Sequence, residues 1–331
     1  ESVESTTTND ASIEARHDLL PDRSLENSRS SETMESEKES VSSPVEFVHL
    51  HCHTEYSLLE GAVRVSDLFK ETQSRGLKHV AMTDNGTMYG SISFYLKAKS
   101  LGINPIVGCD MFIADDMHEK KRGTSKLVLL CKDFAGYQNL IKLVTFSHLD
   151  GFYYRPRIDL KLIREYSKGL IAISPGPYGA VGSLCGSYDK SQADVVASDL
   201  KEMFGDDFYL GIQRTDAPQE ESINDALIDI SSRLDIPLVV TNDVYYLKKE
   251  QAYLRNALNC IKTGRQLDGD PRASAEHSEQ YFKTAEEMTA LFTDLPQAIK
   301  NTVVIAEKCN FEIDTEQVLL PNFECPEPHT P

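Results

Sequence analysis

The amino-acid sequence predicts an α/β fold of the barrel type. Segments with the patterns of strands and helices alternate along roughly 200 residues, which is typical of βα units with parallel strands. The sequence has no GxGxxG motif, and so many βα units without it favour a barrel over a dinucleotide-binding fold. Polar residues that can bind metal ions follow four of the strands, where the mouth of such a barrel would lie.

The strands are predicted from short alternating or apolar runs. Residues 46–51 alternate between apolar and polar side chains, and residues 127–131 form an apolar run typical of a buried strand. Strands are expected at residues 46–51, 78–83, 105–107, 127–131, 170–174, 208–213 and 237–241.

The helices are predicted from amphipathic patterns that end at helix-breaking residues. Gly76 ends the first helix and Gly102 ends the second. Helices are expected at residues 65–75, 89–100, 137–146, 190–204 and 220–234.

From Gln266 onward the pattern changes to helices followed by an extended end. Thr284 and Glu287 form a capping box that predicts the start of a helix, and a second helix is expected at 296–309. We therefore predict a barrel domain at 46–264 and a helical linker at 265–331.

The first 45 residues differ from the rest of the chain. Residues 1–44 hold eleven Asp or Glu against four Lys or Arg, fifteen Ser or Thr, and no Phe, Tyr or Trp. Such a segment cannot bury enough apolar surface to offset the entropy lost on ordering, so a disordered acidic tail is expected at 1–45. Transit peptides are rich in Arg and poor in acidic residues, which argues against that alternative.

Composition restricts the function. The 331-residue chain has 40% hydrophobic residues, a formal net charge of −18, and no apolar run near the roughly 18–20 residues that span a bilayer, so no membrane contact is expected. Because Lys and Arg supply most of the affinity for phosphate, so acidic a chain is expected to bind nucleic acid poorly by itself. Seven cysteines without a CxxC pair indicate reduced thiols and a cytoplasmic protein.

The first candidate site is the sequence H-L-H-C-H at residues 49–53. His51 and His53 are two residues apart, so on a strand they point to the same side and could share a metal ion. Glu60 follows shortly and adds a carboxylate. A histidine pair can also pack in a core or lie on a surface, but a position at the mouth of a barrel favours chemistry.

Three further polar clusters follow predicted strands. Asp84 could bind a metal ion or orient a histidine ligand, and a turn or helix cap is the alternative. Asp110 follows the third strand, and Asp243 follows the strand at 237–241. Four such positions at strand ends indicate a common site more strongly than any one of them.

These segments resemble the PHP (polymerase and histidinol phosphatase) superfamily, and most closely the N-terminal PHP domain of bacterial replicative DNA polymerase III alpha subunits. The motifs are F-V-H-L-H-C-H at 47–53, Y-S at 56–57, T-D at 83–84, G-C-D at 108–110 and T-N-D at 241–243. Segments at 132–140, 151–158, 282–288 and 301–310 are similar as well. The resemblance implies a distorted seven-stranded (β/α) barrel whose mouth can hold up to three metal ions. It also implies that 46–264 is the PHP domain and that 265–331 leads into a polymerase core, which would use Mg²⁺.

The sequence departs from the family at the metal ligands. Residues of other kinds stand where family members with a full site have His or Cys ligands: Asn85, Lys126, Gly176 and Tyr245. Two carboxylates differ in length from those of the family: Glu60 and Asp110. The ligand candidates that remain are His51, His53, Glu60, Asp110 and Asp243. They suffice for at most one weakly bound Zn²⁺ or Mn²⁺, and an ammonium at Lys126 would repel further ions.

The resemblance implies two alternative functions. In the first, the domain supports the core of a DNA-directed DNA polymerase, a nucleotidyltransferase, and docks a separate proofreading exonuclease subunit. The acidic charge fits a protein partner, with DNA bound by the full polymerase. In the second, the domain is an active metal-dependent phosphoesterase, a 3′–5′ exonuclease in which two or three ions stabilise the oxyanions. The lost ligands favour the first function. The similar segments after Asp243 disfavour a free-standing histidinol phosphatase.

Overall fold

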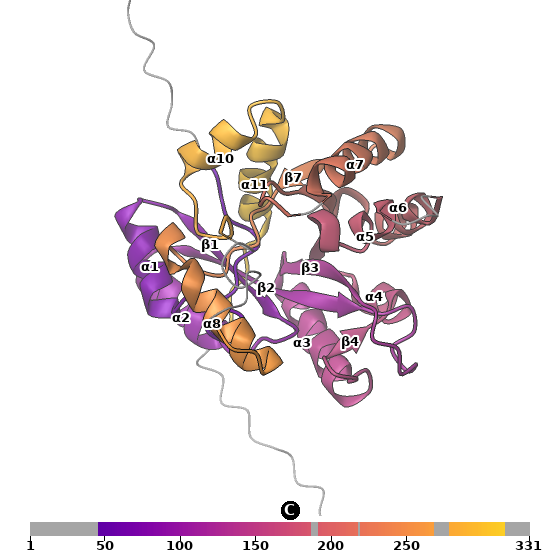
Figure 1. Ribbon diagram of the computed structural model, residues 1–331, viewed down its shortest axis with the longest axis horizontal. Helices are drawn as coiled ribbons and strands as arrows, with labels where there is room; N and C mark the ends of the chain where they lie inside the picture. The colour runs from indigo at the N-terminus through magenta and orange to yellow at the C-terminus, as the bar shows by residue number, and fades with distance from the viewer. Residues whose placement is uncertain (1–45, 187–190, 218, 268–277, 315–331) are drawn as a thin grey trace, which may run out of the picture. The chain divides into compact units, whose positions relative to one another are not determined.

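A seven-stranded sheet forms the centre of the fold (Figure 1). The computed structural model describes residues 46–186, 191–217, 219–267 and 278–314; the predicted acidic tail and the end of the predicted linker lie outside these ranges. The strands are β1 (His79–Asn85), β2 (Asn104–Ile113), β3 (Ser125–Cys131), β4 (Arg157–Ile158), β5 (Leu170–Pro175), β6 (Phe208–Ile212) and β7 (Leu238–Val240). Their order is β1-β2-β3-β5-β6-β7, with β4 paired to β2. The α/β class and the curled seven-stranded sheet confirm the predicted fold.

The extended segment that contains His51 and Cys52 lies between β1 and the chain after β7, the two ends of this strand order. The Thr83 N–H at the end of β1 donates to the Cys52 carbonyl over 2.8 Å, and the Val244 N–H after β7 donates to the His51 carbonyl over 3.0 Å. The prediction of a strand at 46–51 is wrong in detail, because the only bridge that the described structure records for this segment joins Cys52 and Val244. One cause is that the Val48 N–H is bound by the Thr302 hydroxyl and not by a strand.

The expectation that all strands run parallel is wrong for β3. It pairs antiparallel with both β2 and β5, whereas β1–β2, β5–β6 and β6–β7 are parallel. The connection from β2 to β3 is a loop without a helix, and parallel neighbours need a long crossover, usually helical. The start of β3 therefore lies at the same edge of the sheet as the end of β2.

Helices surround the sheet. They are α1 (Val65–Ser74), α2 (Ser91–Ser100), α3 (Phe134–Leu149), α4 (Leu160–Tyr166), α5 (Gly182–Cys185), α6 (Ser191–Phe204), α7 (Glu220–Leu234), α8 (Ala252–Thr263), α10 (Ala285–Leu291) and α11 (Pro296–Lys308). The predicted helices are all present, and the capping box of Thr284 and Glu287 opens α10 as expected. Sequence patterns missed α4, α5, α8 and the two-residue strand β4. No helix in the described ranges is long and apolar enough to cross a membrane.

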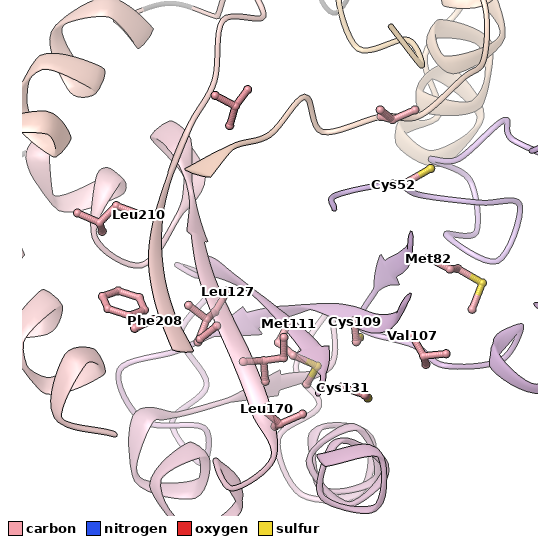
Figure 2. Close-up of a cluster of buried hydrophobic side chains, with 14 of the residues drawn as sticks. Cys52, Met82, Val107, Cys109, Met111, Leu127, Cys131, Leu170, Phe208 and Leu210 are labelled. Atoms are coloured by element: carbon pink, nitrogen blue, oxygen red, sulfur yellow. The ribbon is translucent and has the colours of Figure 1, made fainter. Parts of the chain in front are cut away.

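The alternation of side chains along the strands produces two hydrophobic clusters. The outer cluster combines one face of the strands with helix residues such as Leu68, Phe94 and Leu140, and Figure 2 shows part of it, with side chains from β1, β2, β3, β5 and β6. The inner cluster combines the other face, including Ile106 and Val128, with residues of α11. The sheet therefore has a filled interior.

Helix α11 fills one part of this interior. Ile305 and Ala306 are fully buried, and with Cys309 they belong to the inner cluster. Helix α11 thus shares a core with strands of the predicted 46–264 domain. The division at residue 264 stays a prediction.

Candidate metal centre

Four polar side chains converge in the interior near the carboxyl ends of the parallel strands. His51, His53, Asp110 and Asp243 each offer one ligand atom, and these atoms all lie within 4.8 Å of one another. All four residues are buried. The structure thus brings together four of the five candidate ligands named from the sequence.

The backbone places each of these side chains. Asp110 lies inside β2, not after a strand as expected, and the two-residue period of the strand puts it on the same face as Ile106 of the inner cluster. Asp243 follows β7 with a φ of 47°, in the left-handed region that is costly for a non-glycine residue. The Gln280 amide donates to its Oδ2 over 2.8 Å and holds the other oxygen toward the histidines. Such strain at a buried carboxylate is typical of a functional position.

Most separations within the group are close to those around a single tetrahedral ion. The Nε2 atom of His51 lies 3.0 Å from Asp110 Oδ2, 3.2 Å from His53 Nε2 and 3.3 Å from Asp243 Oδ1. The Nε2 atom of His53 lies 2.9 Å from Asp243 Oδ1 and 3.8 Å from Asp110 Oδ2. Metal–ligand bonds of about 2.0–2.1 Å in tetrahedral geometry put ligand atoms about 3.3 Å apart. Because the four ligand atoms spread over up to 4.8 Å and two metal–ligand bonds span at most about 4.2 Å, these residues could hold one metal ion after they move closer together.

A hydrogen-bond relay links His53 to Asp84. The Ser57 hydroxyl donates to Asp84 Oδ1 over 2.7 Å, and its oxygen lies 3.3 Å from His53 Nδ1. Without an ion, the His53 Nε2–H donates to Asp243 Oδ1 over 2.9 Å. Because the Ser57 hydroxyl proton is directed at Asp84, Ser57 can accept the proton of His53 Nδ1 when Nε2 binds a metal ion. Asp84 also accepts bonds from the Thr54 N–H and hydroxyl. Asp84 is thus linked to His53 through Ser57, and its role in orienting the histidine stays a prediction.

A lysine ammonium lies against the same group. Lys126 Nζ donates to Asp110 Oδ2 over 2.6 Å and to Asn85 Oδ1 over 2.9 Å, and it lies 3.4 Å from the Tyr245 hydroxyl. The Asn85 amide donates to the same hydroxyl over 3.3 Å. Three of the four positions that depart from the family therefore form one hydrogen-bonded network beside the donor group.

These charges set the protonation of the carboxylates. Burial alone would raise the pKa of Asp110, but Lys126 and His51 lower it to about 2. Burial opposes the charged form of Lys126, and the carboxylate of Asp110 nevertheless raises the pKa of the lysine well above its usual value. Burial lowers the pKa of His53. The result is a charged lysine and carboxylate beside a neutral His53, which is the state that binds metal.

The remaining two candidate positions do not join the donor group. Glu60 accepts a bond from the Asn85 amide over 2.7 Å and pairs with Lys262 of α8. Gly176 follows β5 with a φ of 42°, and a Cβ there would lie 2.5 Å from Gln213 Oε1. A cysteine side chain at Gly176 would require movement of Gln213.

Some contributing residues escaped the sequence analysis. Gln280 holds Asp243 in place from a loop, where no periodic pattern marks it. Arg255 of α8 lies 3.4 Å from the ring centroid of Tyr245, and the His53 ring stacks on the same tyrosine at 4.1 Å. The Nε and Nη1 atoms of Arg255 have no hydrogen-bond partner among the described residues. The contact of Arg255 with Tyr245 could not be predicted from the sequence, because it depends on the position of α8 beside the mouth of the barrel.

Comparison with known proteins identifies the relatives of this chain. The family model described as "PHP domain" matches residues 49–215. DNA polymerase III subunit alpha of Borreliella burgdorferi is 38% identical over 289 residues, which is 85% of this chain and 25% of the relative. The same subunit of Thermus aquaticus is 35% identical over 312 residues, 88% of this chain and 25% of the relative. The chain thus spans about a quarter of the length of the curated relatives it matches.

Solved structures with a similar arrangement are more distant. A putative metal-dependent phosphoesterase from Bifidobacterium adolescentis has 13% sequence identity and a TM-score of 0.43, over 75% of this chain and 96% of that one. An amidohydrolase from Chromobacterium violaceum has 13% identity and a TM-score of 0.42, over 60% of this chain and 88% of that one.

Proposed function

The chain belongs to the PHP domain family, and from this premise we propose that it acts as the N-terminal PHP domain of a replicative DNA polymerase III alpha subunit. In this role it supports the polymerase core and docks a separate proofreading exonuclease subunit during DNA replication in the cytoplasm. DNA binding and nucleotidyl transfer belong to the full polymerase. The identity of 35–38% along most of the chain supports this assignment.

The contact between Lys126 and Asp110 carries the proposal that the domain is a scaffold and not a nuclease. Hydrolysis of phosphodiesters by clustered metals needs a second ion about 3.5–4 Å from the first, usually held through a shared carboxylate. Here the Asp110 oxygen that faces His51 also accepts the Lys126 ammonium, over 2.6 Å. The Lys126 ammonium therefore neutralises the carboxylate charge of Asp110 and occupies the space that a second ion would need.

The donor group then holds at most one ion, bound weakly. Two imidazoles and two carboxylates suit Zn²⁺ or Mn²⁺. When bound, such an ion would supply Lewis acidity at the mouth of the barrel. His51, His53, Asp110 and Asp243 would hold it, and the adjacent ammonium of Lys126 would weaken its binding by charge repulsion.

The 3′–5′ exonuclease remains a second candidate because one observation favours it. Most of the ligand atoms already stand near tetrahedral separations, and His53 Nε2 faces the donor group. A lysine beside one ion could then stabilise a phosphate oxyanion electrostatically.

Metal analysis combined with a nuclease assay separates the two candidates. The purified chain is dialysed against Zn²⁺ or Mn²⁺, its metal content is measured, and a 3′-labelled single strand is offered as substrate. The scaffold proposal expects one equivalent or less and no cleavage above that of His51→Ala. Two or three tightly bound equivalents with cleavage that His51→Ala abolishes would establish the exonuclease instead.

Restoring the family ligands provides a second test. Asn85→His alone should raise metal affinity only modestly, because Lys126 still occupies the site. The triple variant Asn85→His, Lys126→His and Tyr245→His should bind close to a second equivalent. Copurification with the exonuclease subunit of the same organism tests docking, which these substitutions inside the mouth should leave unchanged.

A further inference from the structure

A row of aromatic rings lies exposed on one face of the molecule, away from both hydrophobic clusters. Tyr89 is 65% exposed, Phe152 58% and Tyr154 65%. Large apolar side chains this exposed cost free energy in water unless they have a partner, and adjacent ones mark interaction sites. We name the row, with His148 and Tyr153 between its members, the aromatic strip.

The rings of the aromatic strip follow one another at short distances. The His148 ring lies 6.3 Å from that of Tyr89 and 6.4 Å from that of Phe152, in a stacked orientation in the second case. Tyr153 and Tyr154 follow Phe152 in the sequence, and their rings are perpendicular with centroids 4.7 Å apart. The strip runs from the chain before α2, over the end of α3, to the loop before β4.

Positive charges accompany the strip although the chain as a whole is strongly acidic. The Arg122 guanidinium lies 4.1 Å from the ring centroid of Tyr154, and that of Arg155 lies 4.6 Å from that of Phe112. Neither arginine has a carboxylate partner among the described residues, and both are exposed. In the same loop Lys120 is a further exposed cation, whereas Lys121 pairs with Glu119 and Lys126 binds Asp110. The expectation of weak nucleic-acid binding, drawn from net charge alone, does not take this local distribution into account.

A buried arginine fixes the geometry of the strip. Arg157 donates to the carbonyls of Met117, Glu119 and Lys121, which precede Arg122, and to the carbonyl of Gly151, which precedes Phe152. His148 Nε2 lies 2.9 Å from the Gly86 carbonyl, which fixes its ring at the centre of the row. The loop with the cations and the loop with the rings are thus tied to one buried guanidinium, so little ordering entropy remains to be lost on binding.

We propose that the aromatic strip binds single-stranded nucleic acid. Aromatic rings in series offer stacking surfaces to successive unpaired bases, and arginines beside them pair with the backbone phosphates. An acidic peptide would use the same cations but has no flat bases for the rings. A duplex keeps its bases stacked on one another and unavailable to the rings. The site does not depend on metal binding or on the scaffold role of the barrel mouth.

Fluorescence anisotropy with a labelled oligothymidylate of about 12 nucleotides tests the proposal on the full chain, since such sites cover about 4–16 nucleotides. We expect saturable binding at low salt that weakens as salt rises. Phe152→Ala and Tyr154→Ala should each weaken binding about tenfold. Arg122→Ala should weaken it and lower the salt slope by about 1.

Matched controls keep the test specific. Tyr253→Ala removes another exposed tyrosine, on α8, and Arg164→Ala removes an arginine of α4 that pairs with Glu202. Both should bind within about twofold of the unmodified chain, and thermal unfolding should show that every variant is folded. The proposal is overturned if the unmodified chain does not bind at low salt or if the strip variants bind as tightly as the controls. Equal competition by polyglutamate, or equal binding of a duplex, also overturns it.

Discussion

Lys126 donates a hydrogen bond to Asp110 over 2.6 Å, and this pair places a tethered cation beside four potential metal ligands. The antiparallel register of β2 and β3 creates the contact. Asp110 stands opposite Val128, so Lys126, two residues earlier, is its diagonal neighbour on the same face. The pair explains how a barrel mouth with buried carboxylates can be stable without several metal ions.

Lys126→Met should destabilise the protein and make it dependent on metal. Removal of the ammonium leaves the Asp110 carboxylate buried without its cation, at an expected cost of about 2 kcal/mol, below the usual range for fully buried pairs because the lysine keeps some solvent access. Thermal unfolding with and without Zn²⁺ measures this. Zn²⁺ should raise the melting temperature of Lys126→Met more than that of the unmodified chain. Lys99→Met, which breaks an exposed pair with Glu312, is the control. Equal melting temperatures of the two variants would contradict this prediction.

Ser57→Ala should weaken metal binding while leaving the ligands in place. It removes the acceptor of His53 Nδ1–H, so the ring loses its fixed orientation, and changes of this kind lower metal affinity about 10–100-fold. Competition with a zinc indicator dye gives the affinity. Ser74→Ala, which removes an exposed hydroxyl at the end of α1, should leave it unchanged. An unchanged affinity in Ser57→Ala would show that Ser57 does not orient the ligand.

Ile305→Ala should show that α11 belongs to the barrel core. Ile305 is fully buried in the inner cluster, and its truncation should cost about 2–4 kcal/mol. The adjacent Val304 is 42% exposed, so Val304→Ala should cost less than about 1 kcal/mol. Urea unfolding gives both values. A chain that ends at residue 264 should accordingly fail to fold cooperatively, and a stable fold without α11 would contradict the prediction.

Asp207→Asn should remove a stabilising contribution that depends on pH. Burial alone would raise the pKa of Asp207, but its pairs with Lys132 and Lys308 lower it below the ordinary value of about 3.9. A carboxyl whose pKa is lower in the folded state stabilises the protein above the unfolded pKa, and this contribution is lost as the pH falls through the folded pKa. The variant should therefore be less stable by about 1 kcal/mol at pH 7, and the difference should shrink below about pH 4. Urea unfolding at pH 7 and below about pH 4 measures this difference in stability. The control is Asp194→Asn, which breaks an exposed pair with Arg233.

Much of the fold could be predicted from the sequence because strand and helix periodicities are local. Helix ends depend on nearby residues, and the capping box of Thr284 and Glu287 is formed as expected. The helix predicted at 137–146 begins earlier, at Phe134, because the Asp133 side chain accepts from the Gly136 N–H and caps it. The antiparallel direction of β3 was missed because strand direction depends on the connection and not on the strand itself.

The sequence by itself determined the ligand types and half of their geometry. His51 and His53 are two residues apart in an extended segment, so both Nε2 atoms reach the same donor group. Only the tertiary structure decided which carboxylates complete it. Asp110 lies in β2 and Asp243 follows β7, whereas Glu60 pairs with Lys262 of α8 and stays outside the donor group. Pairings between residues so far apart in the chain depend on strand register and helix position, and no local pattern encodes either of these.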